Sequence, residues 1–164
     1  MKKSIVVIAL VVLSFALAQN AMAQPATANQ TLNLAVNTVQ KIAVSGDPAA
    51  MTISDGTAGT DALTSVSNAL TTYSMTQNSS TPAKITAGLN SALGAGYSLQ
   101  ITLASLKGTS VVAVDISNGT AKDVVTGMAK GADAGQTITY TFGANASAGI
   151  MTSTAKTVTL TLTN

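Results

Sequence analysis

Apolar and polar residues alternate along most of the chain. The clearest case is the segment 157–163, where Val158, Leu160 and Leu162 alternate with threonines. Successive side chains of a β-strand point to opposite faces of a sheet, so this period of two predicts strands with one apolar face. Other segments with this character are residues 31–36, 39–44, 51–53, 72–77, 85–89, 99–103, 111–116 and 138–142.

Turn-forming residues separate these predicted strands. Asp55-Gly56 and Lys107-Gly108 indicate turns, and Asn118-Gly119 is typical of a β-hairpin. Residues 129–135 and 143–149 are rich in glycine, alanine and serine and are predicted to be loops. The pattern predicts a single all-β domain, an Ig-like or pilin-like antiparallel β-sandwich of about seven to ten strands, which follows an N-terminal signal helix.

One segment has helical rather than alternating spacing. Leu63, Val66 and Leu70 recur at intervals of three and four residues, which would place them on one face of a helix. We therefore keep one or two helical turns within residues 61–70 as an alternative to an extended connection.

The start of the chain has the three-part pattern of a secretory signal peptide. Two lysines follow the first methionine, residues 5–18 are apolar apart from Ser14, and residues 21–23 have the small-x-small form of a signal-peptidase site. The apolar run is shorter than the roughly 20 residues that a membrane-spanning helix needs. We expect residues 1–23 to be removed by cleavage between Ala23 and Gln24.

Cleavage gives a mature β-sandwich domain of residues 24–164 that is secreted or held at the cell surface, without membrane insertion. The net charge of +2 then disappears, because the six remaining lysines are balanced by six aspartates. A neutral domain without arginine lacks the electrostatic pattern of a nucleic-acid-binding protein, so we expect no nucleic acid partner. Near-neutrality is compatible with self-association.

The side chains that perform most enzymatic chemistry are absent or rare. The sequence contains no histidine, cysteine, glutamate, arginine or tryptophan. Ser153 and Lys156 match the S-x-x-K motif, in which a lysine activates a serine on one face of a helix. Here the pair leads into a predicted strand, where residues three apart face opposite sides. We therefore predict a protein that is not an enzyme and has no catalytic residues.

Three aspartates are the best candidates for metal binding. Asp47, Asp55 and Asp61 lie in a stretch rich in glycine and threonine and could offer oxygen ligands to calcium. Their spacing matches no EF-hand loop, and aspartates in such stretches commonly form Asx turns. We expect no metal and no cofactor.

Residues 24–37 have two interpretations. Leu32, Leu34 and Val36 follow a polar lead and alternate with polar or small residues. The segment is either the first strand of its own sandwich or an N-terminal extension that inserts into a groove of a neighbouring subunit. Alternation is equally compatible with both. These three residues form the candidate strand-exchange interface.

Several of the alternating segments support a resemblance to known proteins. They are Tyr73-Ser74-Met75, Lys84-Ile85-Thr86-Ala87, Leu99-Gln100-Ile101-Thr102-Leu103, Val124-Val125-Thr126-Gly127, Ile138-Thr139-Tyr140-Thr141-Phe142 and Thr157-Val158-Thr159-Leu160-Thr161-Leu162-Thr163. In these segments the chain resembles secreted bacterial β-sandwich proteins of the fimbrial and spore-coat-protein-U type. It lacks the cysteine pair that many of them carry. The resemblance implies surface fibres or coats assembled by strand exchange.

The C-terminal strand is also similar to that of WxL cell-wall-binding domains. Leu160-Thr161-Leu162 lies where those domains carry Trp-x-Leu, and the tryptophan is missing. Peptidoglycan binding through that motif is therefore not expected.

Together these patterns predict an exported structural protein, a subunit of a surface fibre or coat that self-associates through β-strand contacts. The alternative is a monomeric secreted or cell-surface domain that binds polysaccharide or cell wall. Such sites commonly stack aromatic rings on sugars, and the mature chain offers few rings, chiefly Tyr73, Tyr97 and Tyr140.

Overall fold

The computed structural model describes residues 26–164, which contain nine strands and one short 3-10 turn, Ala146–Ala148. The expected signal peptide and the cleavage site between Ala23 and Gln24 lie outside the described residues. The chain divides into Met1–Val36 and the folded unit Asn37–Asn164. Within residues 26–164 there is no helix with the length and apolar character needed to span a bilayer.

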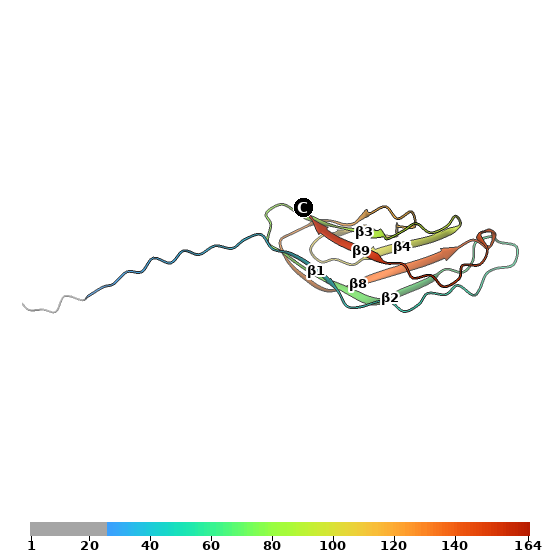
Figure 1. Cartoon of the computed structure of the whole chain (residues 1–164), viewed down its shortest axis with the longest axis horizontal. Coiled ribbons are helices and arrows are strands. Elements are labelled where there is room, and N and C mark those ends of the chain that lie inside the picture. Colours follow the sequence, from blue (N-terminus) through green and yellow to red (C-terminus); the bar gives the residue numbers. More distant parts are fainter. Residues whose placement is uncertain (1–25) are drawn as a thin grey trace, which may run out of the picture. The chain divides into compact units, whose positions relative to one another are not determined.

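The strands form two antiparallel sheets. They are β1 (Gln40–Val44), β2 (Val66–Gln77), β3 (Ala83–Leu89), β4 (Tyr97–Leu103), β5 (Thr109–Ser110), β6 (Val114–Asp115), β7 (Lys122–Met128), β8 (Gly131–Ala144) and β9 (Val158–Thr163). The first sheet has the order β1-β2-β8-β4-β6 and the second has the order β5-β7-β3-β9. Figure 1 labels β1, β2, β8 and β4 of the first sheet and β3 and β9 of the second. The predicted all-β class is confirmed, with two antiparallel sheets.

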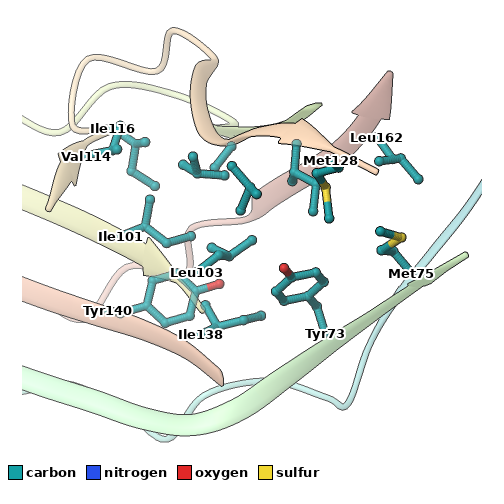
Figure 2. Close-up of a cluster of buried hydrophobic side chains, with 14 of the residues drawn as sticks. Tyr73, Met75, Ile101, Leu103, Val114, Ile116, Met128, Ile138, Tyr140 and Leu162 are labelled. Carbon is teal, nitrogen blue, oxygen red and sulfur yellow. The ribbon is translucent and has the colours of Figure 1, made fainter. Parts of the chain in front are cut away.

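One hydrophobic core collects side chains from both sheets. Tyr73, Ile101 and Ile138 come from the first sheet, and Met128 and Leu162 come from the second (Figure 2). The inward residues of β3 and β4 follow the predicted alternation: they are buried at every second position. The core is therefore built mainly from aliphatic side chains on alternating strand positions.

The helical turns considered for residues 61–70 are absent, and β2 already begins at Val66. The pairing of β2 with β8 shifts register between Asn68 and Thr71, and these two residues are buried while Leu70 is 81% exposed. A bulge adds one residue to a strand and shifts the inward positions from a spacing of two to three. Leu70, one of the three apolar residues with helical spacing, is therefore not part of a buried face.

The prediction of a loop at residues 129–135 is also wrong, because β8 begins at Gly131. Asp133 lies opposite Met75 of β2 and is buried. Its Oδ2 accepts hydrogen bonds from the Ser105 hydroxyl at 2.9 Å and from the backbone N–H groups of Leu106 at 2.9 Å and Lys107 at 3.2 Å. These bonds let a carboxylate occupy an inward position that the alternation rule reserves for an apolar residue.

Four further local predictions are corrected. The predicted loop at residues 143–149 begins inside β8, which ends at Ala144. No strand is assigned at residues 51–53, and the strand predicted at residues 111–116 is reduced to β6. Asn118-Gly119 does form a turn, with Gly119 at a φ of 79°. This turn joins β6 of the first sheet to β7 of the second, so it does not close a hairpin.

Stability should fall at alkaline pH because of two tyrosines in the core. Burial raises the pKa of Tyr73 and of Tyr140 above the ordinary value. A group with a raised pKa in the folded state contributes stability that is complete below its unfolded pKa, about 10, and is lost as the pH rises above it. We expect the free energy of unfolding to be lower at pH 11 than at pH 8 in urea titrations. Tyr140→Phe removes one titrating group and should weaken this dependence; an unchanged dependence would contradict the assignment.

Candidate assembly edge

Each sheet has two edges, and the edges on one side are closed by short strands. β5 and β6 have two residues each and lie at the ends of different sheets. The intervening residues 111–113 connect the two sheets. Val111 N–H donates to the Val124 carbonyl at 2.9 Å, and Ala113 N–H donates to the Thr102 hydroxyl at 2.9 Å. Short strands of this kind leave little edge for another strand to pair with.

The edges on the other side are the longer strands β1 and β9. Each pairs with one neighbour, β1 with β2 and β9 with β3, and the two edge strands contact each other across the sheets (Figure 1). Within the described residues, no strand pairs with the outer side of either one. An edge strand leaves backbone N–H and C=O groups available to a further strand.

The inner face of β9 is incompletely covered. Val158 and Leu160 are half-buried and Leu162 is buried, whereas Ile85 and Ala87 of the neighbouring β3 have no exposed surface. We call Val158, Leu160 and Leu162, together with the outer backbone of β9, the β9 edge. Two of its apolar side chains, Val158 and Leu160, remain partly accessible at the side of the core.

Amide side chains join the beginning of β1 to the end of β9. The Gln40 Nε2 group donates a hydrogen bond to Asn164 Oδ1, and Asn164 Nδ2 donates to the Ser79 hydroxyl at 2.8 Å. The strand β1 therefore begins beside the point where β9 ends, and the two strands run in roughly opposite directions (Figure 1).

Charge distinguishes β1 from β9. Lys41 is an exposed residue of β1, and charged residues on an edge strand oppose pairing with another chain. Residues 158–163 carry no charge. Of the two longer edge strands, β9 is therefore the uncharged one.

The short edge strand β6, on the far side of the first sheet, contains Asp115. The Ser117 hydroxyl and N–H donate hydrogen bonds to this carboxyl and hold its pKa below the ordinary value.

The predicted strand-exchange residues lie in the segment before the folded unit. Leu32, Leu34 and Val36 are 76%, 83% and 88% exposed. No strand is assigned in the described chain before Gln40, and residues 26–36 contain no charged side chain. An apolar side chain at every second position thus faces solvent in an uncharged segment.

Asn78, which the sequence analysis did not single out, binds the backbone just before β1. Its Oδ1 accepts a hydrogen bond from Val39 N–H at 2.7 Å, and its Nδ2 donates to the Asn37 carbonyl at 2.9 Å. Its own backbone N–H donates to the Val39 carbonyl at 3.2 Å. We call these three hydrogen bonds the Asn78 clamp. In the sequence, this role of Asn78 is indicated only by its position directly after a predicted strand.

The S-x-x-K residues do not act on each other. Ser153 is exposed outside any helix or strand. The Lys156 ammonium group donates to the Ser91 hydroxyl at 2.7 Å and to the Ala92 carbonyl at 3.2 Å. The lysine is therefore engaged by the loop that follows β3.

Two of the three aspartates considered for calcium have local partners. Asp55 accepts a hydrogen bond from Gly56 N–H at 2.8 Å, and Asp61 accepts two from the N–H and hydroxyl of Ser147. Residues 26–164 contain no group of three acidic residues placed to hold a metal ion. Asp61 thus fixes the 3-10 turn beside it.

Aromatic rings contribute little to the surface of the described chain. Tyr73 and Tyr140 are buried, and Tyr97 and Phe142 are half-buried. The Tyr97 hydroxyl donates to the carbonyl of Ala148 at 3.2 Å, so that group already has a partner within the chain. A sugar-binding platform usually needs rings that a ligand can reach.

No known protein family, curated protein or solved structure matches the chain. The function is therefore inferred from two surfaces, the exposed N-terminal segment and the β9 edge.

Because β9 is incompletely covered, two similar leucine-to-alanine substitutions should lower the free energy of unfolding by different amounts. Leu103→Ala empties a fully buried site and should lower the free energy of unfolding by about 2–5 kcal/mol. Leu160→Ala removes a half-buried side chain and should cost about 1 kcal/mol. Urea titrations of dilute, monodisperse protein measure both. Equal losses would show that the inner face of β9 is already covered.

Proposed function

We propose that the mature chain is an exported, non-enzymatic structural protein, a subunit of a surface fibre or coat. In this proposal, residues 30–36 of one copy add as a strand to the β9 edge of the next copy. One observation carries the proposal: the same chain has an exposed, uncharged segment with alternating apolar residues and an uncharged strand edge with accessible apolar residues. Strand addition to a sheet edge uses these two features.

The strand order supports a finer interpretation of the fold. In an Ig-like sandwich, chain-ordered strands A to G form the sheets A-B-E-D and C-F-G. The order β1-β2-β8-β4 corresponds to A-B-E-D, and the pair β3-β9 corresponds to C-F. Among the described strands, none occupies the place of G beside β9. This order supports the proposal of an Ig-like or pilin-like sandwich in which this place is free for a strand from another copy.

The spacing of the apolar residues is the same on both surfaces. Residues two apart on a strand lie on one face, about 6.8 Å from each other. Leu32, Leu34 and Val36 therefore match the spacing along the β9 edge. When the two triplets are aligned, the middle residue, Leu34, lies opposite Leu160 in either strand direction. Burial of an exposed leucine or valine is favourable by roughly 1.5–3 kcal/mol, so each of the three contributes to the contact.

The polysaccharide-binding alternative has less support. The four aromatic residues of the described chain are buried or half-buried. The exposed apolar residues of the N-terminal segment are aliphatic, and aliphatic side chains offer no ring face on which a sugar can stack.

A charge at the centre of the segment should prevent assembly. Leu34→Asp, in protein that starts at Gln24, places a carboxylate where the proposal requires an apolar contact with Leu160, and a buried unpaired charge is strongly unfavourable. Negative-stain electron microscopy and size-exclusion chromatography with light scattering should show filaments or oligomers for the unmodified protein and monomers for the variant.

The matched control is Asn33→Asp, which adds the same charge one residue away, on the opposite face of the segment. It should assemble as the unmodified protein does. Because Leu34 and Asn33 are both exposed, neither change should alter thermal unfolding of the monomer. Equal assembly by Leu34→Asp and Asn33→Asp would refute the proposed contact. An unmodified protein that stays monomeric and binds glycans on an array would favour the alternative.

A further inference from the structure

We propose that the Asn78 clamp directs residues 30–36 to a second copy of the chain by preventing them from pairing with the β9 edge of their own chain. This inference rests on the proposed function, since it concerns which copy receives the segment. It identifies Asn78 as a residue that determines specificity without itself taking part in the contact.

The clamp holds residues 37–39 in an extended conformation. In an extended chain, the N–H and C=O groups of every second residue point to the same side. The Asn37 carbonyl and both backbone groups of Val39 are bound by the same residue, Asn78. The Asn78 side chain thus acts like a short stretch of neighbouring strand and extends β1 backwards by three residues.

For the segment to pair with β9 of its own chain, residues 37–39 would have to form a turn and could not stay extended. Because β1 begins beside the end of β9 and runs away from it, a segment that enters β1 at Gln40 must first reverse direction to lie along β9 of the same chain. The residues available for this reversal, after the apolar triplet ends at Val36, are residues 37–39. These are the residues that the clamp keeps extended.

A turn before residue 37 would not allow all three apolar residues to pair with β9 of the same chain. A tight turn uses about four residues, so a turn that ends before Asn37 would include Leu34 and Val36. These two residues could not then occupy positions along β9. With the clamp intact, all three apolar residues can reach a β9 edge together when that edge belongs to another copy.

The experiment uses engineered disulfides, since the chain has no cysteine. Ala35→Cys is combined with either Thr159→Cys or Thr161→Cys, in protein that starts at Gln24. If Leu34 lies opposite Leu160, residue 35 lies opposite 159 in an antiparallel arrangement and opposite 161 in a parallel one. All three positions are exposed and face away from the apolar contact. After oxidation, non-reducing gels separate intrachain bonds, which leave a monomer, from interchain bonds, which give a ladder.

When the Asn78 clamp is intact, we expect one of the two cysteine pairs to form interchain bonds, which give a ladder on the gel. Adding Asn78→Ala should increase the intrachain fraction of the Ala35→Cys and Thr161→Cys pair several-fold, because residues 37–39 become free to turn. Asn118→Ala is the matched control: it removes an exposed asparagine that accepts a hydrogen bond from Thr120 N–H at 3.0 Å in a distant turn. It should leave the ladder unchanged. A general loss of stability would lower the yields of both intrachain and interchain bonds and would not convert interchain bonds into intrachain bonds.

The outcomes separate this inference from the proposed function. If neither pair forms any bond, the segment does not reach a β9 edge and the proposed function fails. If intrachain bonds predominate with the clamp intact, the segment pairs with its own chain, and both the proposed function and the role of Asn78 are refuted. If a ladder forms and Asn78→Ala leaves it unchanged, the proposed function stands and the role of Asn78 alone is refuted.

Discussion

A β-sheet has to end, and its last strand leaves backbone hydrogen-bonding groups without a partner in the sheet. The two sheets formed by residues 26–164 have four such ends. Two are reduced to the two-residue strands β5 and β6, and β1 carries Lys41. The fourth, β9, is six residues long and uncharged and has none of these protections. The assembly that we propose follows from this difference, because a strand from another copy would satisfy the backbone of β9 and cover its side chains.

The composition of the core makes the β9 edge important for the domain itself. Only two aromatic side chains, Tyr73 and Tyr140, are buried in the described core, so stability depends on many small aliphatic contacts. Leu160 and Val158 belong to the border of that core while remaining half-buried. An added strand would therefore complete the core of the receiving copy as well as joining two copies, and folding and assembly would use the same apolar surface.

Alternation was sufficient to locate β3, β4 and β9, because their inward residues repeat without interruption. It failed where tertiary structure changes the period or the polarity of a strand. The register shift after Asn68 leaves Leu70 exposed although Leu63, Val66 and Leu70 have helical spacing. Asp133 is buried because groups some 28 residues earlier in the chain donate hydrogen bonds to it. For the site, alternation located the N-terminal triplet. It did not locate the accepting edge, because alternation specifies faces and leaves strand order undetermined.

The groups that we assign to assembly are neutral. The triplet and the β9 edge are uncharged, the junction between β1 and β9 is held by the amides of Gln40 and Asn164, and the residues just before β1 are held by the amide of Asn78. Neutral hydrogen bonds and apolar burial are little affected by salt screening, which weakens contacts between exposed charges. An amide can also donate and accept at once, so Asn78 can replace a strand neighbour where a carboxylate would repel the Asn37 carbonyl. Amides at this junction therefore set chain direction without making the contact depend on pH or ionic strength.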